Sequence, residues 1–266
     1  MGVAEVSGAR SVLVTGAASG IGYGIATLFA RAGDHVAMLD RDQPKVEQAA
    51  SQLRSEGGEV LPVAVDVRDA GSIRAAVEQT VRQHGRLDVA VSNAGVYPNT
   101  PVLEMDEDEW DLVLDTNLKG TYLVCRAAAR QMVEQNKRAS PGQGGKICAI
   151  ASGAHQSARV GAAHYCASKA GLVLFAKVLA LELAEHKINV NVVSPGFVDV
   201  GERPGVSAAY RAAISQMIPW GRSGRPEDIA RAVFFVCSAE AEFITGAVIP
   251  VDGGSSAGRF MLPPSG

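Results

Sequence analysis

Three residues between positions 151 and 169 carry side chains that suit proton transfer to or from an alcohol or carbonyl oxygen. Tyr165 and Lys169 are four residues apart, so they share one face if the segment is helical. An ammonium a few ångströms from a phenol favours the phenolate and lowers the phenol pKa from its reference value of about 10. Ser152 follows the apolar run Lys146–Ala151, and its hydroxyl would reach a substrate oxygen beside the phenol. Tyrosine and lysine at this spacing also occur on ordinary amphipathic helices, so the rest of the chain must support a catalytic interpretation.

A glycine-rich turn near the N-terminus is suited to binding a phosphate. Residues Ser11–Thr15 have strand character, and a helix to about Ala32 follows the sequence Gly-Ala-Ala-Ser-Gly-Ile-Gly. Glycines here permit a tight turn and the close approach of a pyrophosphate, whose charge the helix N-terminus stabilises. The spacing differs from Gly-x-Gly-x-x-Gly, and an ordinary β–α turn explains the glycines equally well. Asp40 ends the next predicted strand, twenty residues after Gly20, where dinucleotide folds place the acid that binds the adenosine ribose.

Strand and helix patterns alternate along the whole chain. Such alternation predicts right-handed β–α–β crossovers, a parallel sheet and one α/β domain over residues 1–266. The segment 197–224 has no regular pattern and is expected to form a lid or substrate loop, and 135–145 is expected to be a surface loop. The further predicted strands are 35–39, 60–65, 87–91, 146–151, 188–193 and 247–251, and the further predicted helices are 44–55, 70–84, 107–134, 162–187 and 226–238.

Composition argues against several classes of function. The 266 residues carry a formal net charge of -3, so no nucleic acid or membrane partner is expected. The N-terminus lacks a signal-peptide pattern, and the apolar stretch Leu172–Leu183 is interrupted by charges and too short to cross a bilayer, which predicts a cytoplasmic protein. The four cysteines form no Cys-x-x-Cys pair and lie in apolar surroundings, so we expect reduced thiols and no metal site.

Several motifs in order resemble those of the classical short-chain dehydrogenase/reductase family over essentially the whole chain. The sequence Thr-Gly-Ala-Ala-Ser-Gly-Ile-Gly at 15–22 is similar to the family's nucleotide-binding turn. The resemblance implies a doubly wound, single-domain Rossmann fold with a seven-stranded parallel sheet and helices on both faces. The remaining matches are Asn93-Ala94-Gly95, Asn117 in Asp-Thr-Asn-Leu-Lys-Gly, Ser152, Tyr165 with Lys169, Pro195-Gly196 and Val251-Asp252-Gly253-Gly254.

The resemblance implies a catalytic tetrad of Asn117, Ser152, Tyr165 and Lys169. Tyr165 would exchange a proton with the substrate oxygen while hydride passes between the substrate carbon and nicotinamide C4. Ser152 would hold that oxygen, and Lys169 would lower the Tyr165 pKa and bind the nicotinamide ribose. Asn117 would anchor a water in a proton relay, and it would at the same time be able to cap a local helix distortion.

The resemblance and the spacing together also indicate the residues that hold the cofactor. Asp66 has a second interpretation as a loop cap. Many relatives carry a threonine four residues after the glycine of Pro-Gly, whereas this chain has Val200, which leaves the contact of this segment to the nicotinamide amide open. The implied set is Gly16, Ser19, Gly20, Ile21 and Gly22 at the phosphates, Asp40 at the ribose, Asp66 and Val67 at the adenine, Asn93, Ala94 and Gly95 along the nucleotide, Tyr165 and Lys169 at the nicotinamide ribose, and Pro195, Gly196 and Val198 at the nicotinamide.

Asp40 favours NAD(H) over NADP(H), because its carboxylate would repel a 2′-phosphate. At an effective dielectric constant of about 20, two like charges about 4 Å apart repel by about 4 kcal/mol. Arg41, the next residue, opposes this preference, since an arginine there selects NADP in some relatives. Those relatives generally lack the preceding acid or carry a basic residue in the glycine turn, where this chain has Ser19.

We therefore predict an NAD-dependent oxidoreductase that interconverts a secondary alcohol, such as a sugar, a polyol or a cyclic or aliphatic alcohol, and its ketone. The alternative is a 3-oxoacyl-[acyl-carrier-protein] reductase using NADPH, for which Arg126, Arg130, Lys137 and Arg138 would contact the acidic carrier. A non-catalytic redox sensor is a remote alternative, because such proteins typically lack the tyrosine or the lysine. We also expect a homotetramer that forms through helices 107–134 and 162–187 and a contact near the last strand. The family resemblance implies it, and the chain has apolar residues beyond those that a single core face needs, such as Leu172, Phe175 and Leu179.

Overall fold

Seven short apolar segments form one parallel sheet in the order β3-β2-β1-β4-β5-β6-β7. The computed structural model describes residues 8–138, 144–201 and 207–258. All five residues of β1 are buried, because helices cover both faces of the sheet around it. The strands are β1 Ser11–Thr15, β2 His35–Asp40, β3 Val60–Ala64, β4 Val89–Ser92, β5 Gly145–Ile150, β6 Ile188–Pro195 and β7 Val248–Val251.

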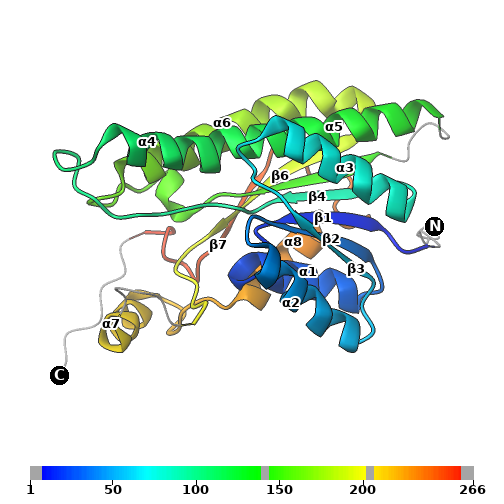
Figure 1. Cartoon of the computed structure of the whole chain (residues 1–266). Coiled ribbons are helices and arrows are strands. Elements are labelled where there is room, and N and C mark those ends of the chain that lie inside the picture. Colours follow the sequence, from blue (N-terminus) through cyan, green and yellow to red (C-terminus); the bar gives the residue numbers. More distant parts are fainter. Residues whose placement is uncertain (1–7, 139–143, 202–206, 259–266) are drawn as a thin grey trace.

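Helices pack on both faces of this sheet, and the expected doubly wound Rossmann architecture is confirmed. Figure 1 shows α3, α5 and α6 on one face and α1, α2 and α8 on the other. Alternate strand residues enter two separate hydrophobic cores, so Leu13 packs under the first group of helices and Val12 under the second. The helices are α1 Gly20–Arg31, α2 Gln43–Ser55, α3 Ala70–His84, α4 Glu107–Leu114, α5 Gly120–Arg138, α6 Ala163–Leu183, α7 Ala208–Met217 and α8 Pro226–Val236.

The long helix predicted at 107–134 is wrong in one respect, because it is not continuous. A π-helical turn, η1 Asp115–Lys119, separates α4 from α5, and the amide of Gly120 donates to the carbonyl of Asp115. A π turn inserts one residue into the helical ladder and rotates the side chains that follow it. Two short 3-10 turns, η2 Gly153–His155 and η3 Ala184–His186, flank α6, so this helix ends four residues before the predicted end.

The segment 197–224 also differs from its predicted irregular form, since it contains α7. Figure 1 shows α7 at the end of the molecule where the strands end. Of the surface loop predicted at 135–145, positions up to 138 extend α5, and positions 139–143 lie outside the described residues. No helix in the described part of the chain is both long and apolar enough to cross a membrane.

Candidate active site

The carboxyl ends of β1, β4, β5 and β6 carry the predicted site residues. Because parallel strands end at the same edge of the sheet, Gly16, Asn93, Ser152 and Gly196 meet at that edge although they are far apart in sequence. The order in which the strands follow one another reverses between β1 and β4. Doubly wound folds bind their ligands at such a switch point.

Tyr165, Ser152 and Lys169 lie together at this edge. Ser152 is close enough to the phenol of Tyr165, in the first turn of α6, for its hydroxyl to act to lower the phenol pKa. The Lys169 ammonium, one turn later, is buried, donates to the carbonyl of Ile150 at 2.8 Å and lies 5.8 Å from the centre of the Tyr165 ring. The end of β5 therefore holds the lysine directly, and Ser152, two residues after Ile150, lies near the phenol.

The protonation balance of this group differs from the predicted one. Burial of the Tyr165 side chain raises the pKa of its phenol, although the hydrogen bond to Ser152 and the positive charge of Arg159 both act to lower it. Burial also lowers the pKa of the Lys169 ammonium to about 8. The expectation of a lowered Tyr165 pKa is wrong for this structure, because removing the phenolate from water outweighs the favourable contacts.

Asn117 joins the π turn to the loop that follows β4. Its side-chain oxygen accepts the Val96 amide at 2.8 Å, and its side-chain nitrogen donates to the Val96 carbonyl at 2.8 Å and to the Ser168 hydroxyl at 3.3 Å. The side chain is fully buried. It therefore does not cap the helix distortion in which it lies, but fixes a neighbouring loop to the π turn and to α6.

The glycine turn before α1 leaves room for an anion. Gly16 and Gly20 have φ angles of 64° and 58°, a region that favours glycine. A Cβ atom at Gly22 would collide with the carbonyl oxygen of Gly16. Ser19 occupies the N-cap position of α1 without a side-chain cap, and the first turn contains no acidic residue, so its amides are available to a negative group. The turn fits the pyrophosphate of a dinucleotide.

Asp40 lies beside this turn at the end of β2. One of its carboxylate oxygens accepts the Ala18 amide at 3.1 Å and the other accepts the Asp42 amide at 3.1 Å. The carboxylate is thus fixed next to the place where the adenosine ribose of a dinucleotide would lie. Arg41, by contrast, is exposed. This arrangement fits a ribose with free hydroxyls at the end of β2.

Asp66 has a local partner that the sequence did not reveal. Arg68 forms an ion pair with it at 2.6 Å and also donates its backbone amide, and these contacts lower the Asp66 pKa. The loop-cap interpretation therefore describes what this carboxylate does in the structure. Val67 is buried, and a Cβ atom at Gly120 would approach its Cγ2 atom to 2.9 Å. The pair lies at the end of β3, and its contact with the adenine stays a prediction.

Thr15 joins the ends of β1 and β4 at this switch point, and the sequence had suggested no role for it. Its hydroxyl oxygen accepts the amides of Asn93 at 2.9 Å and Ala94 at 3.1 Å, while the Asn93 side chain donates to the Thr15 carbonyl at 2.9 Å. Gly95 lies against Asn117, since an added Cβ atom would be 3.1 Å from its side-chain oxygen. The sequence signal for Thr15 was its place as the first residue of the motif at 15–22, directly before Gly16.

The end of β6 packs against the turn that follows β7. A Cβ atom at Gly196, the residue after Pro195, would lie 2.7 Å from the Asp252 side chain, so this close approach requires glycine. Val198 is buried and pairs with Gly224 in an isolated parallel bridge. Val200 lies over Gly20, where an added Cβ atom would be 3.4 Å from it. The segment after β6 therefore contacts the glycine turn through an apolar side chain at the position where many relatives have a hydroxyl.

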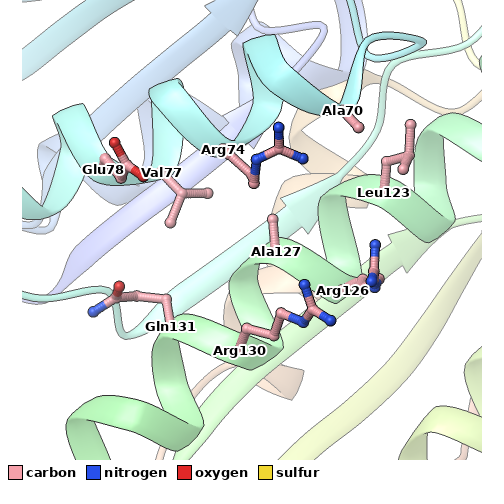
Figure 2. A pocket seen from close by; sticks show the side chains of 9 residues that line it. All are labelled: Ala70, Arg74, Val77, Glu78, Leu123, Arg126, Ala127, Arg130 and Gln131. Atoms are coloured by element: carbon pink, nitrogen blue, oxygen red, sulfur yellow. The ribbon is translucent and has the colours of Figure 1, made fainter.

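The basic residues considered for an acyl carrier lie away from this edge. Arg126 and Arg130 line a cavity of about 210 Å³ between α3 and α5, together with Arg74 (Figure 2). Arg126 is nine residues beyond Asn117, which is about 14 Å along the helix. Lys137 is paired with Glu134 on the surface, and the side chain of Arg138 lies outside the described structure.

The chain is similar to proteins of known sequence and structure over nearly its full length. A family model described as Enoyl-(Acyl carrier protein) reductase matches residues 16–256. The 3-oxoacyl-[acyl-carrier-protein] reductase FabG of Chlamydia muridarum is 36% identical over 92% of this chain and 96% of its own length. D-threitol dehydrogenase of Mycolicibacterium smegmatis is 38% identical over 92% of each chain.

A solved structure gives the same result in three dimensions. A short-chain type dehydrogenase/reductase from Mycobacterium marinum superposes with a TM-score of 0.85 and 36% identity, covering 95% of this chain and 97% of its own. The seven-stranded parallel sheet and the similarity over nearly the full length of the chain indicate the same fold. The chain therefore belongs to the short-chain dehydrogenase/reductase family of NAD(P)-binding oxidoreductases, which act on CH–OH groups.

Proposed function

We propose that this protein oxidises a secondary alcohol to its ketone, or reduces the ketone, with Tyr165 as the acid–base group. The observation that carries the proposal is the grouping of three side chains: the buried Lys169 ammonium donates to the Ile150 carbonyl at 2.8 Å and lies 5.8 Å from the centre of the Tyr165 ring, and Ser152, two residues after Ile150, lies near the phenol. A substrate oxygen placed between the two hydroxyls would receive two short hydrogen bonds. These two hydrogen bonds would stabilise the negative charge that develops on the substrate oxygen during hydride transfer.

The proton steps follow from these positions. In oxidation the Tyr165 phenolate removes the hydroxyl proton of the substrate while the carbinol C–H bond breaks and a C=O bond forms. In reduction the phenol donates its proton to the oxygen as the carbonyl becomes an alcohol. Ser152 donates a hydrogen bond to that oxygen in both directions. Lys169 stabilises the phenolate electrostatically, and Asn117 holds the loop and helix that frame the lysine.

The nicotinamide dinucleotide supplies or accepts the hydride when bound. We place its phosphates at Gly16, Ser19, Gly20, Ile21 and Gly22, because the turn has free amides and no space for side chains at Gly22. Asn93, Ala94 and Gly95 would lie along the nucleotide, with Asp66 and Val67 near the adenine. Lys169 would hold the nicotinamide ribose, and Pro195, Gly196 and Val198 would border the nicotinamide ring.

We propose NAD(H) as the cofactor. The Asp40 carboxylate is held by two backbone amides beside the glycine turn, so it cannot move away from a 2′-phosphate without breaking those hydrogen bonds. A ribose with two free hydroxyls would instead donate to its oxygens. Arg41 is exposed and does not share this fixed position.

The substrate we favour is a polyol, a sugar or another small alcohol. D-threitol dehydrogenase, a relative at 38% identity, supports a polyol. The FabG relatives support 3-oxoacyl thioesters as the second candidate. Against that candidate, Arg126 and Arg130 lie about 14 Å or more along α5 from Asn117 instead of bordering Tyr165. We also propose that the protein acts in the cytoplasm as a homotetramer.

A substrate panel tests the proposal directly. Wild type and Tyr165→Phe would be assayed with polyols including threitol, sugars, cyclic alcohols and a 3-oxoacyl thioester, each with NAD(H) and NADP(H), following the nicotinamide absorbance. We expect turnover of an alcohol by wild type, and a loss in Tyr165→Phe of at least about 10²-fold in kcat, which is typical for a general acid–base. Reduction of the thioester alone would favour the second candidate, and a Tyr165→Phe variant with more than a tenth of wild-type kcat would exclude this role for Tyr165.

A further inference from the structure

The first turn of α6, which contains Tyr165, lacks the usual hydrogen bond to an N-cap side chain. Ala162 occupies the N-cap position, and the helix starts with the hydrogen bond from the Cys166 amide to the Ala162 carbonyl. The amide of the third residue of a helix, here Tyr165, normally donates a hydrogen bond to the side chain of the N-cap residue. Here the amide donates instead to Nδ1 of His164 at 2.8 Å.

The hydrogen bonds of His164 define its tautomer. Nδ1 accepts the Tyr165 amide, so it carries no proton, and the ring proton must lie on Nε2. Nε2 is 2.9 Å from a carboxylate oxygen of Glu109, to which it donates. The imidazole is fully buried. His164 is therefore a neutral ring between an amide donor and a carboxylate acceptor, and Glu109 needs only to accept a hydrogen bond.

Glu109 links this histidine to the loop after β4. Its second carboxylate oxygen accepts the Thr100 hydroxyl at 3.0 Å, and the Thr100 amide donates to the Gly161 carbonyl at 2.8 Å. The same loop carries Tyr97, whose ring contacts the Tyr165 ring edge to face with centroids 6.3 Å apart. The loop thus contacts the catalytic residue twice, through its ring directly and through its backbone by way of Glu109 and His164.

We propose that His164, held by Glu109, is a positioning residue that fixes the backbone of Tyr165 and so places its phenol opposite Ser152. This inference rests on the proposed role of Tyr165. His164 touches none of the reacting atoms, and its effect passes through the Tyr165 amide. A misplacement of about 1 Å of a reacting group is able to cost about 10²-fold in rate. The histidine therefore acts on kcat more than on substrate or cofactor binding.

Two conservative variants separate the two contacts of the ring. In asparagine the side-chain oxygen lies where Nδ1 lies in histidine, so His164→Asn keeps an acceptor for the Tyr165 amide and loses the Glu109 contact. In glutamine the amide nitrogen lies near the position of Nε2, so His164→Gln keeps the Glu109 contact and loses the Tyr165 amide. We expect His164→Gln to lower kcat by about 10- to 100-fold and His164→Asn to retain at least about a third of it.

The charge of Glu109 provides a second test. Because His164 is neutral, Glu109→Gln preserves an acceptor for Nε2–H and a partner for Thr100, and we expect at least about a third of wild-type kcat. Glu109→Ala removes both contacts but leaves Nδ1 of His164 to accept the Tyr165 amide, so its kcat should fall less than that of His164→Gln. His186→Gln is a matched control, since His186 and Glu185 form an exposed His–Glu pair at 3.6 Å beyond the end of the same helix. We expect no change in its kcat.

The measurements are kcat, KM and the dissociation constant of the cofactor from fluorescence titration, with thermal unfolding as a check on folding. The inference predicts that His164→Gln loses kcat while KM and the cofactor dissociation constant change by less than about threefold. Equal losses in His164→Asn and His164→Gln, an unchanged kcat in His164→Gln, or a rise in KM and the dissociation constant without a fall in kcat would each overturn it. If Tyr165→Phe retains activity, the proposed function fails first, independently of these variants.

Discussion

Replacing Asp40 by asparagine removes one negative charge at the end of β2 and changes little else. The asparagine oxygen would still accept one of the two backbone amides, from Ala18 or Asp42, that the carboxylate now accepts at 3.1 Å each. The other amide loses its acceptor, which costs about 1 kcal/mol of folding stability. The variant therefore tests charge at nearly constant shape.

The expected change in cofactor preference follows from Coulomb's law. At an effective dielectric constant of about 20 and about 4 Å, each pair of like charges repels by about 4 kcal/mol. Asp40 is half-buried, so we take about half of this value, 2 kcal/mol, to allow for solvent screening. Since 1.36 kcal/mol is a factor of ten, the preference for NAD over NADP should fall by about 30-fold in Asp40→Asn.

The assay compares kcat/KM for NAD and NADP with wild type, Asp40→Asn, Arg41→Ala and the double variant. We expect the change in Asp40→Asn to come mainly from improved use of NADP. Asp42→Asn is the matched control, because Asp42 is a neighbouring carboxylate already paired with Lys45 at 2.8 Å. A wild type that prefers NADP, or a preference that Arg41→Ala alters and Asp40→Asn does not, would refute the reasoning.

Two further predictions concern pH dependence and assembly. Burial raises the Tyr165 pKa, so the phenol is protonated at neutral pH: kcat for oxidation should rise as the pH increases towards that pKa, and kcat for reduction should fall above it. The Arg159 charge lowers the Tyr165 pKa, so Arg159→Gln should raise the pH at which kcat for oxidation and kcat for reduction change. Lys177→Gln, which removes an exposed charge from α6, is the control and should not shift these pH values. An Arg159→Gln variant with unchanged pH profiles would contradict this account. One face of α6 exposes three apolar side chains at helical spacing: Leu174 is 66% exposed, Val178 48% and Leu181 80%. We therefore expect light scattering to show a tetramer, and Leu181→Lys to weaken it. A monomeric wild type at micromolar concentration would contradict this expectation.

The apolar pattern of α6 predicts that this helix has more than one apolar face, but it does not predict which residues face the sheet. The sequence identified α6 as having more apolar residues than one core face needs, but two of the three residues it singled out, Leu172 and Leu179, belong to the core face itself. Leu172 is fully buried and Leu179 is 9% exposed, and both pack in the core. Phe175 is partly buried and contacts the ring of Tyr122 edge to face, with the ring centroids 5.8 Å apart. A helix that is apolar on most sides does not reveal from its pattern which side faces the sheet.

The sequence by itself determined the architecture and the strand ends at which the candidate site residues lie. Buried parallel strands need continuous apolar runs and their crossover helices need amphipathic ones, so the order of elements was predictable from patterns as short as Ser11–Thr15. Residues after strand ends meet at one edge of a parallel sheet whatever the loops between them do. For that reason Gly16, Asn93, Ser152 and Gly196 could be grouped before any coordinates.

Only the tertiary structure decided the electrostatics and the local partners of these residues. The direction of the Tyr165 pKa shift depends on how completely the phenol is removed from water, and Asp66 is engaged by Arg68, whose side-chain direction no motif specifies. The π turn at Asn117 and the contact between His164 and Glu109 join segments from different parts of the chain. Desolvation and hydrogen bonding depend on distances of a few ångströms between such segments, and packing alone sets those distances.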